Sequence, residues 1–259
     1  MNHGRNEYKY LVPNELLDSI RTVLMPYMRH DQHGEGGGLR EYTVRSMYYD
    51  TPGYDCYLEK IDGVANRQKY RIRGYGDPQE QSLVFLEIKM KRGCLISKHR
   101  APLLHTNLEE FLNTPDIDGK ILTLPGLPDP QDCAKRFLYH YYRCRLRPTV
   151  LVVYEREAFQ GRFDQTLRIT FDKRVRGAIP TDLGDLYSDN DLTLPFPRHF
   201  VFEVKFFRGA LPAWVQNLIM EYSLQRMAVS KYSMCLDSSE ARRGTARLRR
   251  AVETDAMPA

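Results

Sequence analysis

Charged and apolar side chains alternate along six segments of this chain, and this alternation constrains the fold more than any other feature of the sequence. Successive residues of a strand point to opposite faces. Lys69, Arg71 and Arg73 would therefore share one face, and the two apolar residues between them would occupy the other. The same alternation occurs at residues 5–10, 84–91, 154–156, 167–172 and 202–206. The sequence thus predicts several strands with one face dominated by Arg, Lys and Glu.

Two architectures accommodate such faces. In an ordinary antiparallel sheet each charged face is simply solvated, but a solvated face usually mixes its charges with Ser, Thr and Gln, and neighbouring like charges repel. If the sheet curls into a barrel, the apolar face packs under helices and the charged face lines a tunnel, and about eight strands leave room for a ligand. The sequence favours the second architecture: an α+β fold with an antiparallel eight-stranded β-barrel tunnel and flanking helices.

The rest of the chain supplies the helices and a tail. Apolar residues at helical spacing predict helices over residues 13–27, 131–144 and 212–226, and an acidic loop is expected over 179–199. Residues 238–259 are polar, with five arginines between positions 242 and 250. We therefore expect one domain over residues 1–237 and a basic tail over 238–259, either disordered or a loosely docked helix.

Composition limits the class of protein. The chain has 259 residues, of which 42% are hydrophobic and 27% charged, enough apolar surface for a core. No apolar stretch of about 18 residues occurs, so no membrane-spanning helix is expected. The five cysteines form no C-x-x-C pair, which favours reduced thiols in the cytoplasm over a disulfide framework or a zinc site.

The predicted tunnel interior indicates the ligand. An interior rich in Arg and Lys requires a polyanion, because Arg binds phosphate oxygens with two parallel hydrogen bonds and Lys acts as a compact point charge. The few carboxylates on the same faces are poor ligands for phosphate by themselves. They suit a divalent cation that bridges to the phosphates.

Nine short segments resemble, in order, those of the vacuolar transporter chaperone (VTC) domain family within the CYTH-like, or triphosphate tunnel metalloenzyme, superfamily. They cover roughly residues 5 to 237, and nine in sequence are far more specific than any one alone. The segments are RNEYKY (5–10), RSMYYDT (45–51), YRIR (70–73), FLEIK (85–89), SKHR (97–100), YEREAF (154–159), LRITFD (167–172), FEVK (202–205) and SKY (230–232).

The resemblance implies the tunnel fold and a reaction, transfer of the ATP γ-phosphate to a growing polyphosphate chain with Mn²⁺ or Mg²⁺. ATP and polyphosphate are then the expected partners, and no nucleic acid is expected. A membrane partner encoded separately stays open. The resemblance also implies a set of basic catalytic residues: Lys9, Arg71, Arg73, Lys89, Lys98, Arg156, Arg168 and Lys231.

Further residues are implied as ligands of substrate or metal. Tyr154 and Ser230 would contact the substrate, as would Lys69, Lys91 and Lys205 on the basic faces. Glu203 corresponds to the metal-binding carboxylate. Glu87 and Glu7 are either further metal ligands or ion-pair partners that keep the basic residues apart.

The chain departs from the superfamily pattern at its start, where Arg5 stands in place of the first Glu of E-x-E-x-K. One candidate metal ligand is thereby lost, which weakens the interpretation of the protein as a simple hydrolase. Two alternatives to the polymerase remain: a triphosphatase acting on inorganic triphosphate, polyphosphate or a nucleoside triphosphate, and a non-catalytic polyphosphate-binding module. Retained basic positions and Glu203 argue against the module, and Tyr154, Arg156 and the Ser230-Lys231 pair favour the polymerase.

Overall fold

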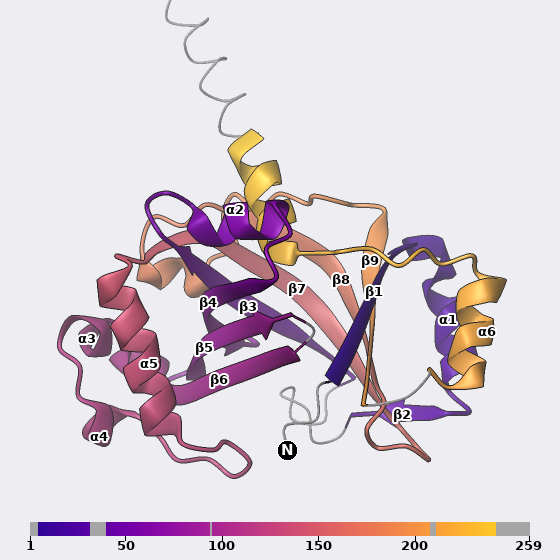
Figure 1. Cartoon of the computed structure of the whole chain (residues 1–259), viewed down its shortest axis with the longest axis horizontal. Helices are drawn as coiled ribbons and strands as arrows, with labels where there is room; N and C mark the ends of the chain where they lie inside the picture. The colour runs from indigo at the N-terminus through magenta and orange to yellow at the C-terminus, as the bar shows by residue number, and fades with distance from the viewer. Residues whose placement is uncertain (1–4, 32–39, 94, 208–210, 242–259) are drawn as a thin grey trace, which may run out of the picture.

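A single antiparallel sheet organises the molecule (Figure 1). The computed structural model describes residues 5–31, 40–93, 95–207 and 211–241. Eight strands form one continuous hydrogen-bonded series, and a ninth, short strand, β2 (Met28–His30), lies outside it and pairs with β7 (Arg147–Gly161). Along that series the strands are, in spatial order, β1 (Arg5–Pro13), β9 (His199–Phe207), β8 (Arg168–Ala178), β7 (Arg147–Gly161), β3 (Glu41–Asp50), β4 (Asn66–Tyr75), β5 (Leu83–Arg92) and β6 (Leu95–Leu104).

The predicted α+β class and the eight-stranded antiparallel path are confirmed, but the sheet is not hydrogen-bonded into a closed barrel. Among the described residues, no strand pairing joins the two edge strands, β1 and β6. The sheet curls instead, and a side-chain contact spans the open side: Nζ of Lys89 on β5, the strand next to the edge, lies 2.9 Å from a carboxylate oxygen of Glu7 on β1.

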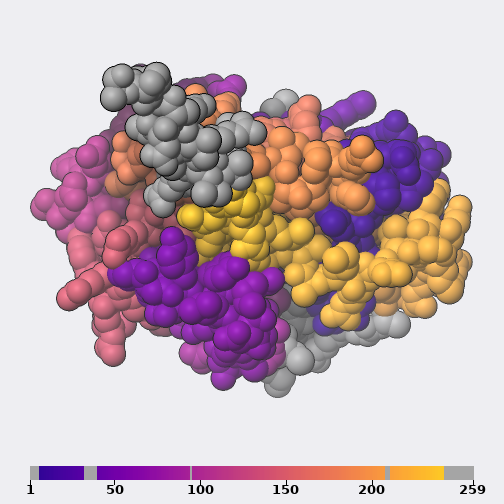
Figure 2. Space-filling view, turned by 90° about the horizontal axis from the view of Figure 1, so that it is seen from above, coloured from indigo at the N-terminus to yellow at the C-terminus, as the bar shows by residue number. Residues whose placement is uncertain are grey.

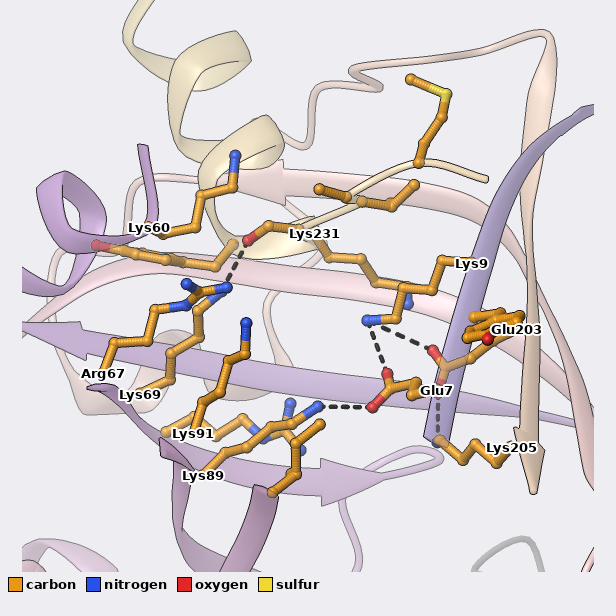
Figure 3. Close-up of a pocket in the computed structure, with 18 of the residues that line it drawn as sticks. Glu7, Lys9, Lys60, Arg67, Lys69, Lys89, Lys91, Glu203, Lys205 and Lys231 are labelled. Carbon is orange, nitrogen blue, oxygen red and sulfur yellow. Dashed lines mark hydrogen bonds and ion pairs between the residues drawn. The ribbon is translucent and has the colours of Figure 1, made fainter. Parts of the chain in front are cut away.

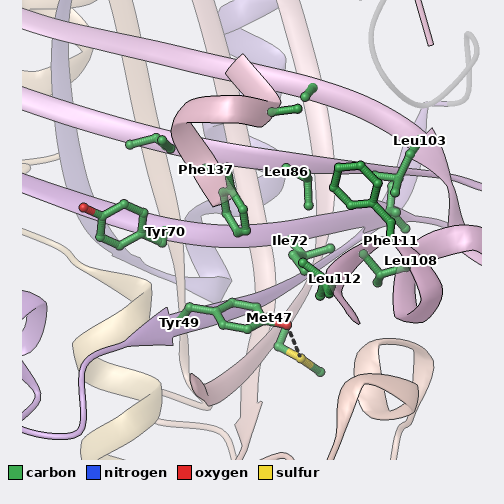
Figure 4. Close-up of a cluster of buried hydrophobic side chains, with 14 of the residues drawn as sticks. Met47, Tyr49, Tyr70, Ile72, Leu86, Leu103, Leu108, Phe111, Leu112 and Phe137 are labelled. Atoms are coloured by element: carbon green, nitrogen blue, oxygen red, sulfur yellow. Dashed lines mark hydrogen bonds between the residues drawn. The ribbon is translucent and has the colours of Figure 1, made fainter. Parts of the chain in front are cut away.

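One apolar cluster covers the outer face of β3 to β6. The helices α3 (Leu108–Asn113), α4 (Ile117–Lys120) and α5 (Pro130–Arg143) pack there. Phe137 and Phe111 point at Ile72 and Leu86 of the sheet (Figure 4), and all four side chains are at most 1% exposed. Because Ile72 lies between Arg71 and Arg73, burying it outward turns both arginines inward.

A second cluster covers the outer face of β1, β9 and β8. The helices α1 (Leu17–Leu24) and α6 (Ala213–Glu221) contribute Leu24 and Leu218, which pack with Phe202 of β9. Because α6 ends at Glu221, it is shorter than the helix predicted over 212–226. Ser223, just after its end, has a positive φ of 51°. Burial of Phe202 outward places its neighbour Glu203 on the inner face.

The last described segment forms a third layer. Residues 231–241 are helical and lie beside α2 (Asp55–Ile61), as the yellow and purple atoms in Figure 2 show. This helix packs closely on β8, because a Cβ on Gly177 would lie 2.5 Å from the Cβ of Cys235. The expected tail thus begins inside this helix, with Ser239 only 4% exposed. From residue 242 onward the tail lies outside the described residues.

Short 3₁₀ helices complete the connections. They are η1 (Asn14–Leu16), η2 (His105–Asn107) and η3 (Leu183–Tyr187). The last lies in the expected acidic loop, where Asp189 forms an ion pair with Arg45 at 2.9 Å. Within the residues that the structure describes, no helix combines the length and the apolar character that crossing a membrane requires.

Candidate functional site: a basic cavity

A cavity of about 840 Å³ lies on the concave face of the sheet (Figure 3). Strands β1, β4, β5, β7 and β9 contribute most of the inward side chains, and β3, β6, the region of α2 and residues 226–232 complete the wall. Thirteen of the sixteen predicted site residues line it, so the alternation identified the correct face of each strand. They are Glu7, Lys9, Lys69, Arg71, Arg73, Lys89, Lys91, Tyr154, Arg156, Glu203, Lys205, Ser230 and Lys231.

Three predicted site residues are not among the lining residues. Lys98 on β6 forms an ion pair with Glu87 at 2.7 Å. Arg168 on β8 forms an ion pair with Asp31 at 3.1 Å. Glu87 itself is fully buried beneath the cavity wall. Their predicted roles stay predictions, and their contacts are with other charged side chains.

Glu87 is surrounded by four cationic side chains. Its carboxylate lies 2.6 Å from Arg71 and 3.9 Å from Arg73. Lys98 at 2.7 Å and Arg100 at 3.0 Å approach the other oxygen. Burial alone would raise the pKa of Glu87, but these cations outweigh it and hold the pKa well below its usual range. This arrangement favours the ion-pair role over the metal role that the sequence left open for Glu87.

A buried carboxylate also fixes the opposite wall. Asp172 on β8 accepts two hydrogen bonds from Arg156, at 2.6 and 2.8 Å, and lies 2.5 Å from Nζ of Lys231. Burial would raise the pKa of Asp172, but Arg156 and Lys231 lower it to about 2. Asp172 therefore holds two cations of the cavity in place, and the residue types and strand parity alone did not reveal this pairing.

Two ionised carboxylates gather at the β1–β9 end of the cavity (Figure 3). Glu7 contacts Lys9 at 2.8 Å and Lys89 at 2.9 Å, whereas Glu203 contacts Lys205 and, at 3.7 Å, Lys9. Burial and the charge of Glu203 would raise the pKa of Glu7, but the lysines lower it to about 2. Burial would likewise raise the pKa of Glu203, which Lys205 and Lys9 hold well below its usual range.

These two carboxylates could supply some, but not all, of the ligands of a divalent cation. Oxygen ligands suit Mg²⁺ and Mn²⁺, and Mg²⁺ is commonly held by one or two carboxylates together with phosphate oxygens. Both Glu7 and Glu203 are ionised and face the cavity. Among the described residues no group of three His, Cys, Asp or Glu forms a metal site. A cation here would therefore need oxygens from its substrate.

The cavity wall carries many more cationic side chains than carboxylates. Burial and neighbouring cations lower the pKa of Lys69 to about 7, and burial lowers the pKa of Lys205 to about 8. Burial is the main cause of both shifts, and for Lys69 the nearby cations Lys9, Lys89, Arg67 and Lys60 add to it. No His or Cys is among the lining residues of the described chain, so the wall offers no thiol or imidazole nucleophile.

Several lining residues were not anticipated. Arg67 shares the parity of Lys69 and Arg71, so extending the β4 alternation by two residues would have found it. Lys60 comes from α2, and Arg226 from the segment after α6, where no strand parity applies. Tyr48 was not predicted because several of its sequence neighbours are apolar or aromatic. Its hydroxyl accepts a hydrogen bond from Arg71 at 2.9 Å.

Two solved structures resemble the fold weakly. A protein from Pyrococcus horikoshii OT3 aligns over 90% of this chain and 98% of its own, with 14% identity and a TM-score of 0.46. A candidate adenylyl cyclase from Hippeastrum, described as having a dominant triphosphatase activity, aligns over 88% of this chain and 93% of its own, with 13% identity and a TM-score of 0.45. Likenesses this weak carry no argument about this chain.

Sequence relatives are more informative. Subunit 4 of the vacuolar transporter chaperone complex of Schizosaccharomyces pombe is 27% identical over 267 residues, covering 90% of this chain and 36% of the relative. The subunit of the same name in Trypanosoma cruzi is 22% identical over 250 residues, covering 83% of this chain and 31% of the relative. The chain thus spans about a third of the length of these relatives. The VTC domain family model matches residues 4–239, and the chain therefore belongs to the VTC domain family.

Proposed function

We propose that this protein is a metal-dependent polyphosphate polymerase that transfers the γ-phosphate of ATP to a growing polyphosphate chain inside the basic cavity. The observation that carries the proposal is a cavity lined by Arg and Lys, with two ionised carboxylates at one end, in a member of the VTC domain family. Phosphoryl transfer needs positioning and charge neutralisation more than covalent help from the protein, and this wall offers both.

Four fixed cations would hold the phosphates. Arg71 and Arg73 are anchored by Glu87, and Arg156 and Lys231 by Asp172. Because these anchors lie behind the wall, the guanidinium and ammonium groups stay in place without a ligand. Preorganised charge of this kind stabilises a transition state more than flexible surface charge does.

Glu203, with Glu7, would hold Mn²⁺ or Mg²⁺. Such a cation, when bound, neutralises charge on the phosphoryl oxygens. Lys9, which contacts both carboxylates, would keep the pair ionised and oriented. The acceptor is a phosphate oxygen, already ionised near neutral pH, so transfer requires no strong general base. The absence of His and Cys from the lining of the described chain is consistent with that.

Two further parts of the proposal concern the surroundings of the enzyme. The named relatives are subunits of a complex, so we include a separate protein partner that receives the polymer. The four described cysteines, Cys56, Cys133, Cys144 and Cys235, are all free. Free thiols fit a reducing compartment, and the cytoplasm, where ATP is available, is the proposed location.

Product analysis with two labels tests the proposal. Purified protein is incubated with Mn²⁺ and ATP labelled at either the γ- or the α-phosphate, and the products are separated on a gel. The polymerase predicts a ladder that carries only the γ label, with the α label in ADP. Free labelled orthophosphate without a ladder would replace the polymerase with a triphosphatase. If neither product forms, the remaining interpretation is a non-catalytic polyphosphate-binding module.

A further inference from the structure

Helix α2 and the residues that flank it carry apolar side chains on the outside of the molecule. Leu58 and Ile61 are 48% and 50% exposed and lie three residues apart, on one side of the helix. Tyr54 before the helix and Val64 after it are 40% and 39% exposed. The N–H of Val64 bonds the carbonyl of Glu59 at 2.9 Å, which keeps Val64 against the last turn of α2. Apolar side chains clustered in this way commonly mark an interaction site, and we call Tyr54, Leu58, Ile61 and Val64 the α2 face.

Negative charge borders the α2 face. Asp55 and Asp62 are exposed, and Glu59 is partly exposed. Burial raises the pKa of Glu59, and the charge of Asp55 raises it further, so these two carboxylates lie close enough to repel each other. The lysine of the same helix, Lys60, lines the cavity instead (Figure 3). The outer side of α2 thus combines apolar groups with acidic ones.

The described part of the chain ends beside this face. The Tyr57 hydroxyl of α2 donates a hydrogen bond to Asp237 of the last helix at 2.7 Å, and the ring of Tyr57 meets that of Tyr232 edge to face. Figure 2 shows the two helices side by side at the surface. Ala241 lies four residues beyond Asp237, about 6 Å along a helix. The chain that follows Ala241 therefore starts about one helical turn from the contact between the two helices.

The sequence of this following segment complements the α2 face. Residues 242–259, which we call the tail segment, contain five arginines against two acidic residues, together with the apolar Leu248, Val252 and Met257. Arginine pairs with carboxylates through two parallel hydrogen bonds. Eighteen residues span up to about 60 Å when extended, so the tail segment is long enough to return to α2.

We propose that the tail segment docks on the α2 face, with its arginines beside the carboxylates of α2 and its apolar side chains on Leu58 and Ile61. This inference goes beyond the proposed function and does not depend on it. A short flexible tether gives the tail segment an effective concentration of about millimolar. It is therefore favoured over a second copy of the chain at micromolar concentration. Because Ile61 also lines the cavity, the docked segment lies at the border of the cavity.

Tryptic cleavage of the tail segment in the full chain tests the docking, because trypsin cuts after its arginines only while they are released. Mass spectrometry follows the first cleavages in the wild type, in the variant Leu58→Gln/Ile61→Gln, and in a free peptide of residues 242–259 as the undocked reference. We expect the wild type to be cleaved about tenfold more slowly than the peptide. The variant should approach the rate of the peptide, since it loses the apolar contact but no cleavage site.

Two further variants separate the contributions. Phe163→Gln/Met220→Gln removes two apolar side chains that are 88% and 68% exposed elsewhere, and should keep the wild-type rate. Asp55→Asn/Asp62→Asn keeps the apolar residues but removes charge, so it should speed cleavage at low salt and match the wild type more closely at high salt. Circular dichroism verifies that each variant is folded.

Each remaining outcome decides against one part of the inference. A wild-type tail segment cleaved as fast as the free peptide would overturn the docking. Slow cleavage that Leu58→Gln/Ile61→Gln leaves unchanged would also overturn it, because something other than the α2 face would then protect the segment. Slow cleavage that is lost on dilution of the chain would assign the α2 face to a second copy. None of these measurements involves ATP, so their results are independent of the polymerase.

Discussion

Three glutamates of similar sequence context serve different purposes at the level of single residues. Glu87 is enclosed by Arg71, Arg73, Lys98 and Arg100 and faces no open space. Glu203 and Glu7 face the cavity beside lysines. Strand parity puts all three on the same face of the sheet, so only the neighbours across strands distinguish an anchor from a candidate metal ligand.

Glu203 is the proposed metal ligand, and its charge can be removed separately from its size. Glu203→Gln keeps the shape of the side chain but removes the charge that would attract Mn²⁺. We expect the variant to bind ATP but to lose stimulation of its activity by Mn²⁺, because the amide is a much weaker ligand. The dependence of the initial rate on Mn²⁺ concentration measures this. A Mn²⁺ response like that of the wild type would place the metal site elsewhere.

Glu87→Gln should instead affect stability. Neutralising this buried carboxylate leaves four cations facing one another, and breaking a buried ion pair from one side costs about 3–5 kcal/mol. Urea denaturation should show the loss in the free energy of unfolding, with any residual activity still responsive to Mn²⁺. Asp132→Asn, which removes an exposed carboxylate paired with Arg136, is the control and should unfold like the wild type. Equal stability of the two variants would disprove the anchoring role.

We expect Lys69 to make the proposed phosphate binding depend on pH. Its pKa, lowered to about 7, means that the free protein leaves it largely neutral at higher pH. An anion favours the charged form, so binding takes up a proton and affinity falls as the pH rises through about 7. Calorimetry in buffers of different ionisation enthalpy measures the uptake, and Lys69→Met should reduce it. Lys205, with a pKa of about 8, should account for part of the proton uptake that remains in this variant. Absence of proton uptake in the wild type would contradict this.

Secondary-structure elements position the site through a network that sequence patterns do not reveal. The buried Asp50 at the end of β3 accepts N–H bonds from Thr51, Cys56 and Tyr57, and the hydroxyl of Tyr232. It thereby joins α2 to the last helix, which begins at Lys231 directly after Ser230, and both of these residues belong to the wall. Tyr232 in turn stacks on Tyr48. The ends of three elements are thus held together by one carboxylate.

Removal of the Tyr232 hydroxyl tests this connection. Tyr232→Phe leaves Asp50 with one hydrogen bond fewer, which should cost about 2 kcal/mol of stability. Because Ser230 and Lys231 then lose a fixed position, we expect the KM for ATP to rise more than kcat falls. The control is Tyr139→Phe, since the Tyr139 hydroxyl bonds Arg143 on the exposed side of α5, away from this connection. If both variants behave alike, the connection does not position the wall.

Sequence patterns predict the strands and their inward faces, but not their partners. Parity requires only a period of two, so the basic faces of β4, β5 and β9 could be identified from residues 69–73, 85–91 and 202–206. Which charges meet depends on register and on curl. The pairing of Asp172 with Lys231, and the position of Lys60 from α2, arise from contacts between distant segments. The open edge between β1 and β6 likewise depends on how the sheet curls.

At the scale of the molecule, the curled sheet separates two environments. Helices α1, α3, α5 and α6 cover its convex face with two apolar clusters. The concave face keeps its charges around a cavity, and beside them a third apolar cluster, which includes Val152, Tyr154 and Tyr232, packs under the last helix. The carboxylates of Glu7 and Glu203 lie at one end of this cavity, and most of the other charged side chains that line it are cationic.

The central claim is that the chemistry occurs at this basic wall, and polymer synthesis by Arg71→Ala and Arg73→Ala tests it most directly. The remaining cations around Glu87 should keep both variants folded, which circular dichroism would verify. With γ-labelled ATP and Mn²⁺, we expect polymer formation to fall by about 100-fold or more in each, the effect of losing one preorganised charge at the reacting phosphate. Full polymer synthesis by both folded variants would contradict the account.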